Sequence, residues 1–146
     1  MRNRFGKALA LAFALGLGGC GSTATGIAVD IDPDPVEAVA QRDGSYVASW
    51  DAVVSNLNGV SGTVQSVEAE VTGASAVTSL ANGVISPAQP SAGMAVEPFA
   101  RRAFRQSAQF RNDTGSSALA VRITVRFTTD DDQSYQATAQ ARISVR

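Results

Sequence analysis

The chain has 146 residues, of which 12 are basic and 13 acidic, and it contains no His and a single Cys. This length suits one domain with a sizeable hydrophobic core. The lack of His excludes Ser-His-Asp catalysis, Cys-His catalysis and imidazole metal sites, and one Cys provides no internal disulfide. The net charge of −1 argues against nucleic acid as a partner, since nucleic-acid-binding proteins carry a basic excess.

The amino terminus has the three parts of a secretory signal. Arg2, Arg4 and Lys7 form a positive start, Ala8–Leu17 is an uncharged apolar run, and small residues follow it. As a helix this run would be about 15 Å long, which is about half the thickness of the hydrocarbon core. The segment is therefore too short to span a membrane.

The residues Leu17-Gly18-Gly19-Cys20 resemble the lipobox of bacterial lipoproteins, in which a Leu and two small residues precede an obligatory Cys. The resemblance implies that residues 1–19 are a signal peptide and that Cys20 becomes the lipidated first residue, anchored in a membrane of the cell envelope. In that family Asp after the Cys favours the inner membrane. Gly21 here favours the outer membrane, facing the periplasm or the surface. The alternative is an ordinary signal peptide with an accidental Cys, or a short buried helix.

Removal of residues 1–19 changes the charge balance. Residues 20–146 retain 9 Arg, no Lys and 13 acidic residues, a net charge of −4. The charge is also divided along the chain, with −8 over residues 20–97 and +4 over residues 98–146. Without Lys, the mature chain has no means of Schiff-base chemistry.

Residues 20–43 are predicted to be a tether. Gly21–Gly26 is small and polar, and the two prolines of Asp30–Pro35 favour extended backbone. Apolar residues alternate within Thr25–Ile31, which is therefore a candidate edge strand. The folded domain is expected to cover residues 44–146.

Beyond Gly44 apolar residues recur at every second position, as half-buried strands require. The pattern predicts strands over residues 45–55, 63–72, 101–111, 119–127 and 134–145, with a weaker one over 76–85. In the second strand Gln65, Val67, Ala69 and Val71 are expected on the inner face. Asn58-Gly59 and Gly62 predict a turn, and Ser86–Gly93 predicts a loop.

The last two strands predict a hairpin with a defined register. Their apolar residues fall on one face only when three pairs lie opposite each other: Phe127 with Tyr135, Val125 with Ala137, and Ile123 with Ala139. A slip of one residue would break this match.

About six or seven strands with short turns, and no long amphipathic helix, predict an all-β antiparallel sandwich. Trp50, followed by Asn58-Gly59 and then Gly62-Thr63-Val64, is also similar to small bacterial immunoglobulin-like domains, with an aromatic-bearing strand, an Asn/Gly turn and a second strand. The resemblance implies an immunoglobulin-like β-sandwich. The chain lacks the paired cysteines that true immunoglobulin domains place around the Trp.

Two acidic clusters are candidate calcium ligands. Asp130, Asp131 and Asp132 would offer carboxylate oxygens at a loop tip, with Asp113 added from another loop. The alternative is a solvated acidic turn. The spacing of Asp30-x-Asp32-x-Asp34 matches the start of a calcium loop, but the Gly and the closing Glu of such a loop are missing.

Six arginines are a candidate basic contact face for anionic lipid headgroups or an acidic polysaccharide. They are Arg101, Arg105, Arg111, Arg122, Arg126 and Arg142. The alternative is a solvated face on which some arginines pair with Glu68 and Glu70 of a neighbouring strand.

We therefore expect a non-catalytic, lipid-anchored accessory or interaction module with no cofactor, whose partners are the membrane and an envelope protein or polysaccharide. One alternative is a binding or inhibitory module for a protease, a glycan or an envelope protein, acting through end loops such as Ser86–Gly93. Another is a hydrolase that uses Glu68 and Glu70 alone, which lie about 7 Å apart on one strand face. Trp50 is expected in the core, with a sugar-stacking platform as the alternative.

Overall fold

The structure is a computed structural model, and it describes residues 26–81 and 94–146. In these residues it is all-β, as predicted, and contains nine strands and no α-helix. The strands are β1 (Ile27–Asp32), β2 (Val36–Ala40), β3 (Tyr46–Asn56), β4 (Gly62–Thr72), β5 (Ala76–Ala81), β6 (Ala95–Val96), β7 (Arg101–Arg111), β8 (Ala120–Thr129) and β9 (Ser134–Val145). Among the described residues there is no helix long and apolar enough to cross a membrane.

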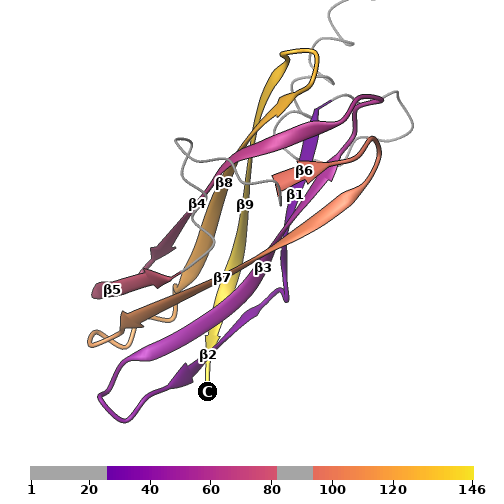
Figure 1. Ribbon diagram of the computed structural model, residues 1–146. Coiled ribbons are helices and arrows are strands. Elements are labelled where there is room, and N and C mark those ends of the chain that lie inside the picture. The colour runs from indigo at the N-terminus through magenta and orange to yellow at the C-terminus, as the bar shows by residue number, and fades with distance from the viewer. Residues whose placement is uncertain (1–25, 82–93) are drawn as a thin grey trace, which may run out of the picture.

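The strands form two groups that are joined through β9 (Figure 1). In the first group β5, β7 and β3 are antiparallel neighbours, and β1 and β2 pair in succession with the other edge of β3. In the second group β6, β4, β8 and β9 are antiparallel neighbours. The last residues of β9 also pair in parallel with β2. This pairing makes one curled sheet of mixed strand orientation, so the prediction of a purely antiparallel arrangement was wrong, because three residues of β9 pair in parallel with β2.

Both groups contribute to a single hydrophobic core. Along β3 the side chains of Ala48, Trp50, Ala52 and Val54 are fully buried, as the alternation predicted. The indole N–H of Trp50 donates a hydrogen bond of 2.9 Å to Oε1 of Gln106 on neighbouring β7. Trp50 is therefore a core residue, and its ring is closed to a stacking sugar.

The β8–β9 hairpin has the predicted register. It places Phe127 opposite Tyr135, Val125 opposite Ala137, and Ile123 opposite Ala139. The three β8 residues of these pairs are buried in the core. The hairpin was predictable because both of its strands alternate without interruption and the turn between them is short.

β4 departs from the predicted alternation at Gln65. Val64 pairs with Phe127 and Ser66 with Arg126, so that Gln65 is an extra residue and forms a β-bulge. The extra residue shifts the inward-facing positions of β4 by one. Val64 before the bulge and Val67 after it are therefore both fully buried, while Gln65 is half-buried. The prediction that Gln65 shares the inner face was wrong for this reason.

The packed domain begins at Ile27, well before the expected boundary at residue 44. The predicted edge strand is present as β1, but β2 also lies within the expected tether. Ile27, Val36 and Ala38 are at most 1% exposed, so this segment belongs to the core. The sequence pattern missed β2 because this short strand follows two prolines and has only two inward side chains.

Two buried asparagines fix the start of β1. Asn58 binds both backbone groups of Gly26, accepting from its N–H and donating to its carbonyl at 2.9 Å each. Asn58 Nδ2 also donates to Asn56 Oδ1, and Asn56 Nδ2 donates to the carbonyls of Val60 and Val96 at 2.9 and 3.1 Å. The predicted Asn58-Gly59 turn is present, and Asn58 and Asn56 together join three segments of the chain.

The two ends of the strands carry different parts of the chain (Figure 1). Gly26, the turns at 57–61 and 130–133, and residues 97–100 lie together at one end, which we call the Gly26 end. Backbone hydrogen bonds join them, from Leu57 to Gly26, from Asn56 to Ala100 and from Asp130 to Ser61. The 41–45 turn, the 112–118 connection and the carboxyl terminus lie at the other end, which we call the Arg146 end.

Candidate functional site

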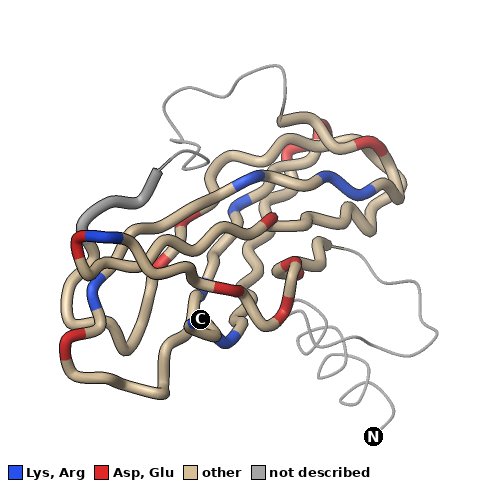
Figure 2. The backbone as a smooth tube through the Cα atoms, turned by 90° about the horizontal axis from the view of Figure 1, so that it is seen from below, with Lys and Arg blue, Asp and Glu red and all other residues tan. Residues whose placement is uncertain are grey.

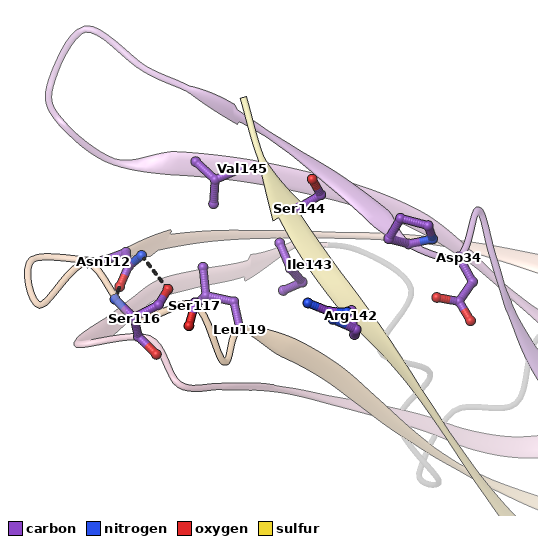
Figure 3. A pocket seen from close by; sticks show the side chains of 11 residues that line it. Asp34, Asn112, Ser116, Ser117, Leu119, Arg142, Ile143, Ser144 and Val145 are labelled. Carbon is purple, nitrogen blue, oxygen red and sulfur yellow. Dashed lines mark hydrogen bonds between the residues drawn. The ribbon is translucent and has the colours of Figure 1, made fainter.

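A cleft of about 560 Å³ lies toward the Arg146 end, where β9 passes from β8 to β2 (Figure 3). Residues 142–145 of β9 form one wall, residues within 112–119 form another, and Asp34 and Pro35 complete it from the bend before β2. The three segments are far apart in the sequence. The β8–β9 pairing sets the first two walls side by side, and the parallel β2–β9 pairing adds the third.

The 112–119 wall is held in shape by its own hydrogen bonds. Asn112 accepts from the N–H of Ser116 at 2.9 Å and donates to the Ser116 carbonyl at 3.1 Å (Figure 3). The Ser116 hydroxyl accepts from the N–H of Ala118 at 3.1 Å, and Leu119 accepts from the N–H of Ile143 at 2.9 Å. This wall is thus built before any ligand arrives.

The cleft combines two opposite charges with hydroxyl groups and an apolar surface. Arg142 and Asp34 are both exposed, and neither forms an ion pair within the described part of the chain. Val145, which is 39% exposed, and the exposed Pro35 supply the apolar surface, whereas Leu119 and Ile143 are almost fully buried. Such a surface can accept a carboxylate or sulfate at the guanidinium, hydroxyl groups at the serines, and a short apolar group between them.

The expected calcium ligands are not brought together. Asp130, Asp131 and Asp132 form the β8–β9 turn, in which the Thr129 hydroxyl hydrogen-bonds Asp131. Asp113 lies at the other end of β8, about 30 Å away at about 3.3 Å a residue. Within residues 26–81 and 94–146 no group of three or more His, Cys, Asp or Glu side chains is placed to hold a metal. The addition of Asp113 to this site was therefore wrong.

The six arginines do not form one strip. Arg101, Arg105 and Arg111 are on β7, whereas Arg122 and Arg126 are on β8 and Arg142 is on β9. In the sheet order β3, β2 and β9 separate β7 from β8. Figure 2 shows basic and acidic residues interspersed along the chain. The alternation along each strand was predictable, but the position of each strand in the sheet was not.

Several charged residues form cross-strand pairs instead. Arg122 pairs with Glu70 at 2.8 Å, and Arg105 pairs with Asp51 at 3.4 Å. Glu68 and Glu70 are exposed on β4, and they line none of the hollows described on the molecule. The Arg122–Glu70 pair is the neighbouring-strand pairing named above as the alternative to a basic contact face.

One titratable group in the 41–45 turn is perturbed. The Ser45 hydroxyl donates to Asp43 Oδ1 at 2.6 Å, and the Ser45 N–H donates to the same oxygen at 3.0 Å. Both bonds favour the charged carboxylate and lower the pKa of Asp43, the hydroxyl bond having the larger effect. The turn between β2 and β3 is therefore more stable when the Asp43 carboxylate is charged.

Other predicted features lie outside the described residues. These are Cys20, its lipobox and the Ser86–Gly93 loop, and their roles stay predictions. Conversely, the sequence did not point to the cleft residues Asn112 and Ser116. The run Asn112–Ser116 has the composition of a turn, which predicts its local bonding but not which strands it faces.

Comparisons with known proteins give a likeness of fold alone. No protein-family model matches the chain, and no curated protein matches its sequence. The structural-genomics target SoR45 is similar with a TM-score of 0.57 at 13% identity, over 81% of this chain and 87% of that one. A structure described as an ApaA protein from Bordetella pertussis gives 0.50 at 10% identity, over 80% of this chain and 93% of that one.

Proposed function

We propose that the protein is a lipid-anchored envelope protein whose folded part is a non-catalytic, immunoglobulin-like interaction module. The lipobox resemblance of Leu17-Gly18-Gly19-Cys20 supports the anchor, with the lipid on Cys20. Gly21 supports the outer membrane as its location, facing the periplasm or the surface. The partner is an envelope protein or a polysaccharide that binds in the cleft at the Arg146 end.

The strand order supports the immunoglobulin-like assignment. Constant-type immunoglobulin domains place strands A, B, E and D in one sheet and C, F and G in the other. Here β1, β3, β7 and β5 follow one another in the first group, and β4, β8 and β9 in the second. In chain order these seven strands take the places A to G. β2 is a continuation of the first strand that pairs with the last.

The opposite placement of Gly26 and the cleft carries the functional proposal. Five residues separate Cys20 from Gly26, so the acyl chains and the Gly26 end lie within about 20 Å of each other. The cleft lies toward the other end of strands that are ten to twelve residues long. A membrane-bound molecule would therefore hold the cleft away from the bilayer, where a partner can reach it.

The anchor is tested by Cys20→Ser. We expect this variant to lose lipid labelling and to leave the membrane fraction, because Cys20 is the only thiol in the chain. Unchanged labelling and fractionation would remove the lipid anchor from the proposal.

The cleft is tested by crosslinking in intact cells. A photoreactive residue at Ser144 lies in the cleft, whereas one at Gln140 lies exposed on the same face of β9 but outside it. We expect a discrete crosslinked partner from position 144 and none from position 140, with loss of the product in an Arg142→Ala background. Equal crosslinking at both positions would contradict a role for the cleft.

A further inference from the structure

We propose that the Gly26 end also contacts the lipid surface directly, through the exposed ring of Phe99. The membrane would then hold the domain at two points and fix its tilt. This inference rests on the proposed lipidation of Cys20. The contact, which we call the Phe99 corner, consists of Val60, Phe99, Arg101 and Arg102.

Phe99 occupies a conformation that does not suit its side chain. Its φ is 55°, in the left-handed region that favours Gly, and 74% of its surface is exposed. The turn is closed by a hydrogen bond of 3.1 Å from the Ala100 N–H to the Glu97 carbonyl. A bulky residue is strained at this position, and the ring gains little burial in return. Gly would serve the fold better, which indicates that the ring acts outside the domain.

The corner is apolar at its tip and charged beside it, with two arginines on β7 and with Glu97, which accepts from the Ser61 hydroxyl at 3.2 Å, toward the acidic turn. The Phe99 ring lies against the 57–61 turn, where a Cβ on Gly59 would be 3.7 Å from Cζ of the ring. Val60 of the same turn is 37% exposed. Arg101 and Arg102 are exposed, and Arg102 donates to the Ala95 carbonyl at 2.7 Å. An aromatic ring at headgroup depth beside guanidinium groups suits an interface that contains phosphates.

The length of the leader selects lipid as the occupant. Five residues between Cys20 and Gly26 allow at most about 20 Å of chain. Gly26 is bound to Asn58 and Leu57, and Asn56 is bound to Ala100, so Phe99 stays beside the point where the leader enters the domain. One ring and one Val are too small for a stable protein interface of about 800 Å² a partner. Beside a covalent anchor, however, a small apolar contact is sufficient to set orientation.

The acidic turn decides which side of the Gly26 end faces the bilayer. The Asp130 N–H donates to the Ser61 carbonyl at 2.9 Å, which places the three aspartates beside the 57–61 turn. Anionic headgroups attract Arg101 and Arg102 and repel the aspartates and Glu97, which is bonded to Ser61 beside the acidic turn. The domain therefore leans toward the Phe99 corner and raises the acidic turn from the surface.

The test uses the full, lipidated chain, in which acylation of Cys20 leaves an introduced Cys as the one free thiol. Gly59→Cys, Asp130→Cys and Arg42→Cys each carry an environment-sensitive fluorophore. Gly59 reports on the corner and Asp130 on the acidic turn, whereas Arg42 lies in the exposed 41–45 turn at the Arg146 end. The proteins are reconstituted in vesicles of phosphatidylethanolamine and phosphatidylglycerol, with and without brominated acyl chains.

We expect strong quenching by the brominated lipid at position 59, weak quenching at 130 and none at 42. Phe99→Gly in the Gly59→Cys background should abolish most of the quenching at 59. The same variant should also raise the urea midpoint of the domain, because it removes the strained residue; loss of quenching thus cannot be attributed to unfolding. Equal quenching at 59 and 130, or quenching at 59 that survives Phe99→Gly, would overturn the contact.

The parent protein separates the two proposals. If Cys20 is acylated, the unaltered chain takes up no thiol reagent in detergent. The quenching experiment then tests only whether the Phe99 corner contacts the lipid. If Cys20 reacts with the reagent, the proposed anchor fails, and the corner fails with it because nothing holds this end at the membrane.

Discussion

Asn56 and Asn58 illustrate how single residues hold this domain together. Both are buried, and their amides hydrogen-bond the backbone at Gly26, in the 57–61 turn and beside β6. A buried amide is costly unless its donors and acceptors are paired, and here they are. The asparagines consequently specify one arrangement of three segments that are distant in the sequence.

Asn58→Ala should lower the free energy of unfolding by about 2–4 kcal/mol, since it leaves the buried Gly26 N–H without a partner and removes the amide bonds to the Gly26 carbonyl and to Asn56 Oδ1. Urea unfolding followed by fluorescence of Trp50 measures the change. Asn112→Ala is a matched control, because among the described residues the Asn112 side chain bonds only within its own loop, to Ser116. It should cost about 1 kcal/mol. Equal losses would contradict a long-range role for Asn58.

Asp43 makes the stability depend on pH. Its pKa is lowered in the folded chain by the hydrogen bonds from Ser45, so the contribution is present above the unfolded pKa and lost as the pH falls through the folded one. We expect the urea midpoint to decrease below about pH 4. Asp43→Asn should make this decrease shallower, as measured by unfolding at a series of pH values. An identical pH profile in the variant would contradict the assignment to Asp43.

At the scale of elements, the bulge in β4 decides which side chains are buried. Gln65 stands between two stretches of β4 that each pair regularly with β8. On both sides of the bulge the inward residues meet the core, at Val64 and at Val67. An extra residue on an otherwise regular strand is thus compatible with the fold, because it stays unpaired and the pairing with the neighbouring strand continues after it.

Deletion of Gln65 should be tolerated, because Val64 and Ser66 keep their partners and their faces when the bulge closes. Deletion of Glu68 is the matched control: it would turn Glu70 inward and Val71 outward. We expect a cooperative urea transition for the first variant and none for the second. A folded Glu68 deletion, or an unfolded Gln65 deletion, would contradict the observed register.

At the scale of the molecule, the start of the domain can be tested by truncation. A chain that begins at residue 44 lacks β1 and β2, whose buried side chains include Ile27, Val29, Ile31 and Val36. At about 1.5–3 kcal/mol each, their loss removes about 6–12 kcal/mol, comparable with the stability of a whole domain. We expect residues 44–146 to be unfolded and residues 21–146 to be folded, by near-ultraviolet circular dichroism. Native-like spectra for both would contradict the observed boundary.

The first described residue and the cleft lie toward opposite ends of the molecule. The leader joins the domain at Gly26, and the cleft between β9 and the 112–119 connection lies toward the opposite end. The proposed lipid anchor and the proposed binding site would then lie at opposite ends of a protein that reaches from a membrane to a partner.

The sequence by itself determined the all-β class and the β8–β9 register, because both follow from alternation between neighbouring residues and from a short turn. It also supplied the lipobox resemblance at Cys20, which is a local motif. Only the tertiary structure decided that β2 belongs to the core, that Gln65 bulges, that the arginine-bearing strands lie apart in the sheet and that Arg142 and Asp34 line one cleft. Each of these depends on which distant strands pair, and pairing is chosen by the packing of the whole core rather than by any one segment.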